Sequence, residues 1–379
     1  MADDRIGIGI IGLGAQGNAH LRALLACQDA AVVALCDPNA DALRLAEFSA
    51  KQGWAQPQLL NDYHELLGHA GVQAVIIAVP DDLHREVTVA AFRAGKDVLL
   101  EKPIARTIED ADAILAAAEA SGRLLQLGLV YRYSRHYRRM AAIAASGDIG
   151  QPQMAWCQEF RRPFQDVAWY HSQARTGGAL NEKDCHHFDL FNWFLGSRAK
   201  RVCAFGSRAV LVPGGGYLER REPDGTPRYL EYGDNVDHAA VIIEYENGAI
   251  GQLNLCLFLS PATWSHEHYE VGLIGRNGRM IRSDLSRSLL VISGGQDFDE
   301  RQEITVHETP GPRLPHPGGV LQEQEFLRCV RTREPPFASG QIAREASLIA
   351  FAAERSIQEG RVVDVAEVDP RRRPPTAPH

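Results

Sequence analysis

The chain has 379 residues and carries 40 Lys and Arg against 48 Asp and Glu, which gives a net charge of −8. This length predicts two domains or three. Hydrophobic residues make up 45% and charged residues 23%, as is typical of globular proteins. The acidic total argues against a nucleic-acid partner, because phosphate contacts need a clustered basic surface. No apolar run reaches the ~18 residues that span a bilayer, so we expect no membrane partner.

The seven cysteines are odd in number and far apart, and none belongs to a Cys-x-x-Cys pair. The sequence therefore predicts neither a disulfide framework nor a metal site. The N-terminus shows no basic segment followed by an apolar segment and a cleavage site, so no export signal is expected. We expect a reduced, cytoplasmic protein.

Residues 1–128 alternate short apolar runs with segments of helical periodicity, which is the pattern of βαβ units and a parallel sheet. The apolar runs are continuous, as expected of strands that are covered on both faces. The expected strands cover residues 7–11, 32–36, 74–79, 97–100 and 124–127. The expected helices cover residues 16–27, 40–51, 82–94 and 108–120.

Beyond residue 131 the pattern changes to that of a mostly antiparallel sheet with helices to one side, an α+β domain. The expected helices cover residues 181–195, 321–331 and 343–358. The expected strands cover residues 199–212, 237–246, 249–257, 268–274 and 288–292. The Asn-Gly pairs at 247–248 and 277–278 favour tight hairpins. Residues 213–216 and 222–227 are rich in Gly, Pro and charge, which predicts a long surface loop.

The first strand ends in a G-x-G-x-x-G turn that opens a helix, and a second strand then ends in an aspartate. This context makes the motif typical of a dinucleotide site. We expect the phosphates to bind at the turn and the helix N-terminus, formed by Gly12, Gly14, Ala15, Gln16 and Gly17. Asp37 would accept the ribose hydroxyls and repel a 2′-phosphate, which favours NAD over NADP. The alternative is a glycine turn in a fold that binds no nucleotide.

Two further segments follow strands whose carboxyl ends face the ligand side of such a sheet. The strand at 74–79 is followed by Pro80 and His84, and the strand at 97–100 by Glu101 and Lys102. All four are predicted to face the cofactor. Lys102 precedes a proline that restricts its backbone; taken alone, a surface lysine in a turn would be the better interpretation.

Glu182, His186 and Asp189 have the spacing i, i+4 and i+7, so on one continuous helix they would share a face. An acid, a base and a second acid on one face could handle protons. A buried polar patch is an equally good interpretation of the residues alone. His187 points off this face and is not assigned to chemistry.

Taken in order, these motifs resemble the Gfo/Idh/MocA oxidoreductases, and the resemblance extends over nearly the whole chain. It implies a Rossmann domain at 1–128, with a doubly wound parallel sheet and bound NAD. It also implies an α+β domain at 129–368, whose large open sheet would form a homodimer or homotetramer. The last helix could pack back on the first domain. The Pro- and Arg-rich tail at 369–379 is predicted to be disordered.

The resemblance places the family's catalytic lysine on Lys102 and its acid–histidine pair on Glu182 and His186, between the domains. The usual aspartate is replaced here by Glu182. Hydride would pass between nicotinamide and a carbinol carbon of a sugar, sugar acid or cyclitol, with His186 as the base and Lys102 stabilising the alkoxide. The candidate substrate contacts are Tyr131, Arg132, Arg161, Trp169, Tyr170, His171 and His316.

Two other functions remain open at this point. Some relatives cleave glycosides by transient oxidation at C3, and Tyr131 or His171 could then remove the C2 proton. A few relatives have become non-catalytic NAD-dependent sensors. Arg161, Arg162 and Arg175 suit an anionic substrate group, because Arg binds carboxylates in a bidentate manner, although a solvated edge explains them as well.

Overall fold

The computed structural model describes residues 4–50, 53, 57–164, 167–231, 233–260, 267–284, 288–295, 298–307 and 318–372. The chain divides into two compact units. The N-terminal unit comprises Met1–Arg135 and Glu308–Arg344, and the C-terminal unit comprises His136–His307 and Glu345–His379. None of the helices in the described ranges is long and apolar enough to cross a membrane.

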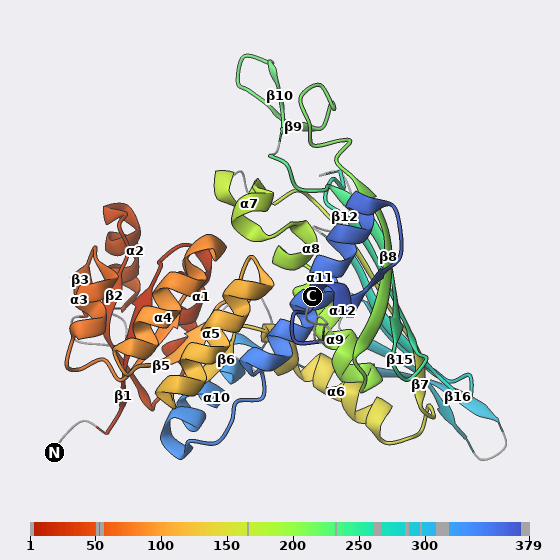
Figure 1. The fold of residues 1–379 in the computed structure, drawn as a ribbon, viewed down its shortest axis with the longest axis horizontal. Coiled ribbons are helices and arrows are strands. Elements are labelled where there is room, and N and C mark those ends of the chain that lie inside the picture. Colours follow the sequence, from red (N-terminus) through yellow and green to blue (C-terminus); the bar gives the residue numbers. More distant parts are fainter. Residues whose placement is uncertain are drawn as a thin grey trace, which may run out of the picture. The chain divides into compact units, whose positions relative to one another are not determined.

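The N-terminal unit is built on a six-stranded parallel sheet in the order β3-β2-β1-β4-β5-β6 (Figure 1). The strands are β1 (Ile6–Ile11), β2 (Ala30–Cys36), β3 (Gln58–Leu60), β4 (Ala74–Ile77), β5 (Asp97–Leu100) and β6 (Leu125–Leu127). The parallel sheet and its five expected strands are confirmed. The sequence did not predict β3, since two of its three residues are exposed and give no apolar run.

Helices cover both faces of this sheet, so it is doubly wound (Figure 1). One face carries α1 (Ala15–Leu24), α2 (Ala40–Ala50) and α10 (Gly319–Thr332); the other carries α3 (Tyr63–Gly68), α4 (His84–Arg93) and α5 (Ile108–Ser121). Successive strand residues point to opposite faces. Thus Ile10 lies in the first core and Ile11 in the second. The short helix α3 was not predicted.

A late segment of the chain completes this unit. Phe326 and Leu327 of α10 are buried in one core with Leu21 and Leu24 of α1. The Gln126 side chain of β6 donates a hydrogen bond to the Gln322 carbonyl at 3.0 Å. The contiguous division expected at residues 128/129 therefore differs from the two units, because an amphipathic pattern does not tell which sheet a helix covers.

The C-terminal unit holds a nine-stranded sheet in the order β16-β15-β14-β13-β7-β12-β11-β8-β17. Every neighbouring pair is antiparallel except β7 and β12, which confirms the mostly antiparallel second sheet. The strands are β7 (Pro152–Arg161), β8 (Ala199–Ser207), β11 (His238–Tyr245), β12 (Ile250–Cys256), β13 (Glu267–Gly275), β14 (Met280–Asp284), β15 (Ser288–Gly294), β16 (Asp299–Thr305) and β17 (Val363–Asp364).

The sequence missed the central strand β7 together with β14, β16 and the helix α6 (Arg135–Ala145). In β7 the fully buried positions include the charged residue Glu159, which hides the apolar alternation of a strand. The Asn-Gly turns were predicted correctly, and they join β11 to β12 and β13 to β14.

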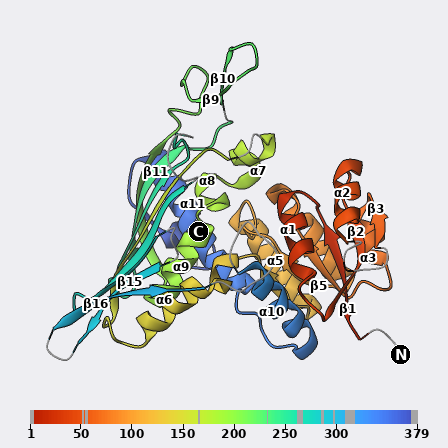
Figure 2. The ribbon, with the colours of Figure 1, turned by 180° about the vertical axis from the view of Figure 1, so that it is seen from behind.

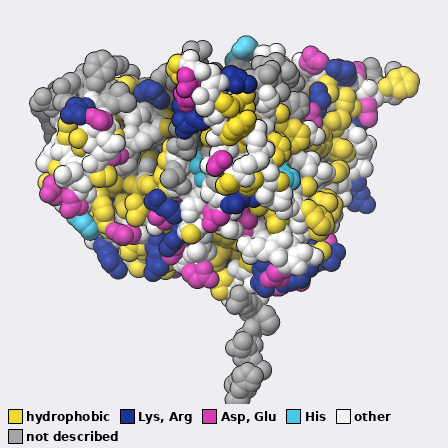
Figure 3. All heavy atoms as spheres, turned by 90° about the horizontal axis from the view of Figure 1, so that it is seen from above, with side chains coloured by type: hydrophobic (Ala, Val, Ile, Leu, Met, Phe, Trp, Pro, Cys, Tyr) yellow, Lys and Arg dark blue, Asp and Glu magenta, His cyan; other side chains and the backbone are white. Residues whose placement is uncertain are grey.

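Helices α9 (Cys185–Leu195) and α11 (Gly340–Glu359) lie on one face of the nine-stranded sheet (Figures 1 and 2). Ser356 of α11 accepts a hydrogen bond from the Ala204 amide of β8 at 2.9 Å. Within the described ranges, no helix covers the opposite face (Figure 2). On the surface visible in Figure 3, Lys and Arg side chains are interspersed with Asp and Glu.

Two local expectations of the sequence are wrong, and the expected surface loop contains a short hairpin. The helix expected over 181–195 is broken into α8 (Ala179–Glu182) and α9. The loop expected at 222–227 is the turn of a hairpin between β9 (Leu218–Arg221) and β10 (Pro227–Tyr229). The tail is ordered at its start, because Asp369 is buried and Arg372 pairs with Glu345 at 2.8 Å. Residues 373–379 of this tail lie outside the described residues.

Candidate functional site

Three glycines shape the turn between β1 and α1. Gly12 has a φ of 87°, and a Cβ there would lie 2.4 Å from the Ala78 carbonyl oxygen. A Cβ on Gly17 would lie 1.9 Å from the Gly12 carbonyl oxygen, so only glycine lets α1 approach the turn. A Cβ on Gly14 would meet no described atom within 4 Å, so the backbone there is open to a ligand. These properties fit a dinucleotide pyrophosphate.

Asp37 follows β2 and holds the same turn. Its Oδ2 accepts a hydrogen bond from the Leu13 amide at 2.7 Å, and its Oδ1 accepts one from the Asn39 amide at 2.8 Å. A carboxylate has about four lone-pair positions, so both oxygens can accept further hydrogen bonds from ribose hydroxyls. Ala15 and Gln16 open α1, and among the described side chains none caps this helix N-terminus. Its first amides can therefore bind phosphate.

A buried charge network holds Glu101 at the carboxyl end of β5. Glu101 Oε1 lies 2.9 Å from His20 Nε2, and its Oε2 accepts a hydrogen bond from the Lys102 amide at 3.0 Å. The other nitrogen of His20, Nδ1, lies 2.5 Å from Glu323 Oε1. Burial by itself lowers the pKa of His20, but Glu323 and Glu101 outweigh it and raise the pKa to about 10. No local signal predicts this network, because Glu323 lies on the late helix α10.

His84 ties together the turns that follow β4 and β5. Its Nδ1 lies 2.8 Å from the Pro103 carbonyl oxygen, and its Nε2 lies 3.1 Å from the Val79 carbonyl oxygen. Burial lowers the pKa of His84, against the two hydrogen bonds to backbone carbonyls. Pro80 directly precedes the 3₁₀ turn η1 (Asp81–Leu83) that leads into α4. These residues fix the backbone at the edge of the sheet that carries Lys102.

Two predicted substrate contacts lie in the N-terminal unit. Tyr131 and Arg132 belong to the 3₁₀ turn η2 (Val130–Tyr133), and both are buried. The Arg132 guanidinium lies 5.2 Å from the centre of the Phe337 ring. This stacking interaction supports the turn.

Glu182 and His186 lie in the C-terminal unit at the junction of α8 and α9, and both are buried. Lys183 and Asp184 interrupt the helix between them. The continuous helix on which Glu182, His186 and Asp189 would share a face is therefore wrong, while His186 and Asp189 remain three residues apart on α9.

A second buried charge cluster surrounds this junction. Glu159 on β7 lies 3.1 Å from Lys183 Nζ and 3.5 Å from His187 Nε2. His187 Nδ1 lies 2.8 Å from Asp184 Oδ1. The sequence assigns no chemistry to His187 and does not predict Glu159, whose inward direction follows only once β7 is recognised as a strand.

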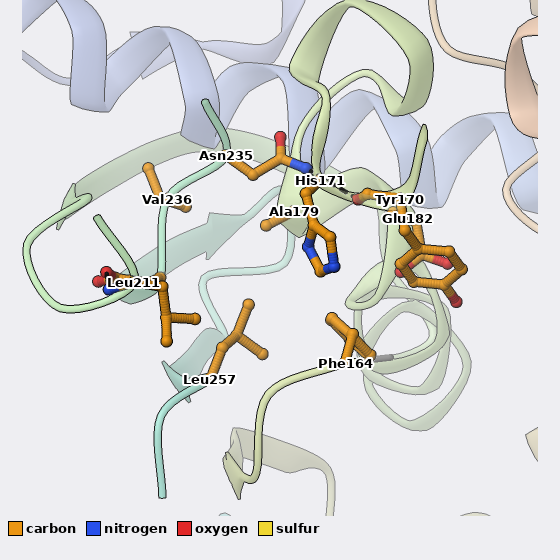
Figure 4. A pocket seen from close by; sticks show the side chains of 10 residues that line it. Phe164, Tyr170, His171, Ala179, Glu182, Leu211, Asn235, Val236 and Leu257 are labelled. Carbon is orange, nitrogen blue, oxygen red and sulfur yellow. Dashed lines mark hydrogen bonds between the residues drawn. The ribbon is translucent and has the colours of Figure 1, made fainter. Parts of the chain in front are cut away.

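A pocket in the C-terminal unit brings three predicted residues together, namely Tyr170, His171 and Glu182 (Figure 4). The His171 ring points into it, and the Asn235 amide donates a hydrogen bond to the Tyr170 carbonyl at 3.2 Å. The remaining lining residues were not predicted as site residues: Phe164, Ala179, Leu211, Asn235, Val236, Asp237 and Leu257. The sequence feature that most of them share is their position, either beside the β9–β10 hairpin or just after the end of a strand.

Other predicted residues lie around this pocket or beyond the described ranges. The Trp169 ring packs against that of Tyr170, with 4.7 Å between ring centres. The Arg161 guanidinium lies 4.3 Å from the centre of the Phe164 ring and 3.4 Å from Glu159. His316 lies outside the described residues. Within those residues, no group of three or more His, Cys, Asp and Glu is arranged to hold a metal ion.

Glu354 of α11 supports the chain just before α8. Its Oε1 accepts a hydrogen bond from the Leu180 amide at 3.4 Å, and a Cβ on Gly178 would lie 2.3 Å from this oxygen. Burial raises the pKa of the Glu354 carboxyl to about 7. Gly178 is therefore needed for this close approach, which positions the segment that carries Glu182.

Two family models match the chain. Residues 6–129 match an oxidoreductase family with an NAD-binding Rossmann fold, and residues 143–365 match the C-terminal alpha/beta domain of the same family. Together they cover both units and the glycine turn, so the dinucleotide that this turn fits is NAD.

Known proteins resemble the chain along nearly its whole length. The myo-inositol 2-dehydrogenase of Thermotoga maritima is 28% identical over 363 residues, which covers 95% of this chain and 99% of that protein. A structure of GenD2 from gentamicin A biosynthesis, in complex with NAD, has a TM-score of 0.76 at 23% identity and covers 95% of this chain and 96% of that one. Levoglucosan dehydrogenase with NADH has a TM-score of 0.79 at 19% identity, covering 95% and 99%. The two structures show that the fold is shared.

Proposed function

We propose that this chain, which belongs to the Gfo/Idh/MocA family of NAD-binding oxidoreductases, transfers hydride between nicotinamide and a carbinol carbon of a sugar, sugar acid or cyclitol. The observation that carries this proposal is the pocket in which Glu182, Tyr170 and His171 meet. Polar side chains beside aromatic rings suit a polyol. The similarity to a myo-inositol 2-dehydrogenase supports a cyclitol among these substrates.

In the proposed reaction, His186 accepts the proton of the reacting hydroxyl, because imidazole titrates near neutral pH. The Lys102 ammonium donates a hydrogen bond to the same oxygen and stabilises the developing alkoxide. Glu182 orients Lys102 or a neighbouring hydroxyl. Bound NAD supplies the hydride acceptor; the Gly12–Gly17 turn and Asp37 hold it.

The test is a panel of sugars, sugar acids and cyclitols with NAD, followed by absorbance of the reduced nicotinamide. We expect Lys102→Met to lower kcat by about 100- to 1000-fold on the substrate that reacts best, because a charge that stabilises the transition state is lost. The matched control is Lys96→Met, at the other end of β5, where the ammonium donates to the Val72 carbonyl at 2.7 Å. A wild-type protein that oxidises none of the panel, or a fully active Lys102→Met variant, would contradict the proposal.

A second candidate is a redox-neutral glycosidase, which the apolar wall of the pocket favours. Leu211 and Leu257 line the side opposite Glu182 (Figure 4), where they could contact the apolar part of a glycoside. Such an enzyme releases the aglycone without accumulating NADH and exchanges the C2 proton with solvent. Aryl glycosides assayed in heavy water distinguish the two: deuterium at C2 indicates the glycosidase, and NADH accumulation with a free polyol indicates the dehydrogenase.

A further inference from the structure

The break between α8 and α9 coincides with a set of buried charged side chains that the proposed mechanism does not use. Glu159 and His187 have no exposed surface, and Lys183 has only 6% of its side chain exposed. Glu159 is reached by three basic side chains: Lys183 at 3.1 Å, Arg161 at 3.4 Å and His187 at 3.5 Å. The Glu159 carboxylate thus connects β7 to Lys183, which follows α8, and to His187, which lies on α9.

The electrostatics of this cluster favour a charged Glu159. Burial raises the pKa of a carboxyl, but Lys183, His187 and Arg161 outweigh it here, and the pKa of Glu159 is lowered. Asp184 behaves differently: burial raises its pKa, against the hydrogen bond from His187. A charged carboxylate in such a place is held by its partners, because a buried charge without them is strongly unfavourable.

The position of the cluster in the chain gives it a consequence for the site. Lys183 directly follows Glu182, and His187 directly follows His186. Lys183 has φ −95° and ψ −49°, and Asp184 has φ −91° and ψ 0°, so the helical hydrogen bonding does not run evenly through the junction. The direction of Glu182 relative to His186 therefore depends on the contacts of the residues beside them. Lys183 and His187 both contact Glu159, and Asp184 contacts His187.

We propose that Glu159 and Lys183 are positioning residues, whose buried ion pair, shared with His187, fixes the mutual orientation of Glu182 and His186. This rests on the proposed function, in which those two side chains handle the substrate. Replacing both partners of a buried ion pair by neutral groups often leaves stability unchanged, whereas removing one partner is strongly destabilising. A comparison of single and double variants can therefore separate the effect of this ion pair on the stability of the protein from its effect on the orientation of Glu182 and His186.

The experiment compares Glu159→Gln, Lys183→Met and the double variant with the wild type. Both single variants are expected to lose thermal stability and kcat. The double variant leaves neither charge of the Glu159–Lys183 pair without its partner. Arg161, which also faces Glu159, keeps 20% of its side chain exposed to water, so we expect the double variant to regain most of the stability lost in the single variants. Its kcat should stay lower by about 100-fold, because the side chains no longer hold the junction and a small misplacement of catalytic groups has this effect. KM and the affinity for NAD, which binds in the other unit, should change little.

The matched control is Ser356→Ala on α11. It removes the buried hydrogen bonds of the Ser356 hydroxyl with the Ala204 amide at 2.9 Å and with the Arg361 carbonyl at 2.5 Å, in the same unit. We expect it to lower the melting temperature and to leave kcat unchanged. A double variant with both wild-type stability and wild-type kcat would overturn the proposal, and so would a Ser356→Ala variant with the same loss of kcat.

A readout that needs no substrate separates this proposal from the proposed function. The imidazole resonances of His186, assigned from a His186→Gln variant, are compared by NMR between the wild type and the double variant. A changed chemical shift and titration midpoint of His186 is the expected result, even if the wild type oxidises no polyol. Identical His186 resonances in the two proteins would overturn the positioning proposal while leaving the proposed function untouched.

Discussion

The Asp37 carboxylate holds the glycine turn in place and is also expected to select NAD over NADP. It holds the glycine turn through the Leu13 amide and presents its other lone pairs on the side where the ribose is expected. We expect Asp37→Ala to weaken NAD binding by about 10-fold, as for the loss of a hydrogen bond to a charged group, and to abolish the preference over NADP. Titration calorimetry with both dinucleotides measures this. Asp41→Ala, which removes a surface partner of Arg44 on α2, is the control. A wild type that prefers NADP would contradict this interpretation of Asp37.

Glu354 makes the stability of the C-terminal unit depend on pH. Its folded-state pKa of about 7 lies above the ordinary value of 4.5, so folding favours the protonated carboxyl. The free energy of unfolding is therefore highest below about pH 4.5 for this group, and it falls by about 3 kcal/mol as the pH rises through about 7. Urea denaturation should show that Glu354→Gln removes this decline and makes the protein more stable than the wild type at pH 8.

The control for this experiment is Glu359→Gln at the end of the same helix. Arg355 lowers the pKa of the exposed Glu359 carboxyl, so its titration lies below pH 4.5. The decline between pH 4.5 and 7 should therefore persist in this variant. An unchanged decline in Glu354→Gln would show that another group titrates in this range.

At the scale of elements, the sequence predicts those helices, strands and turns that depend on residues close together in the chain. The glycine turn, Asp37 and the buried strands of the parallel sheet follow from short motifs and continuous apolar runs. The strand β7 does not, because its inward Glu159 is buried beside Lys183 and His187, which lie far along the chain. The break at Lys183 is hidden for the same reason: residues 179–195 have helical composition, and the partner that interrupts the helix lies more than twenty residues upstream.

The candidate site divides in the same way. Gly12, Gly14, Gly17 and Asp37 could be predicted, because each acts through the backbone close to it in sequence. The network around His20 could not, since Glu101 and Glu323 reach it from distant elements. The apolar wall of the pocket, which includes Leu211 and Leu257, is likewise formed by residues that in sequence are ordinary strand ends.

At the scale of the whole molecule, one face of the nine-stranded sheet is covered by no helix of the described ranges (Figure 2) and exposes apolar side chains. Phe205 on β8 is 75% exposed and Ile242 on the neighbouring strand β11 is 52% exposed. Exposed apolar side chains on adjacent strands are typical of protein interfaces. A second copy of the chain is the partner that we propose, as a homodimer or homotetramer formed through this face.

This assembly predicts that a charge on the face separates the copies. Burying one large apolar side chain contributes about 2 kcal/mol, so Phe205→Glu should raise the dissociation constant by at least about 30-fold for each contact that it breaks. Sedimentation velocity over a range of concentrations measures the shift toward the monomer. The control is Leu59→Glu, a similar exposed change on β3 of the other sheet. Phe205 belongs to the C-terminal unit and the glycine turn to the N-terminal unit, so the monomer should still bind NAD. A Phe205→Glu variant that sediments like the wild type would show that the copies associate through another surface.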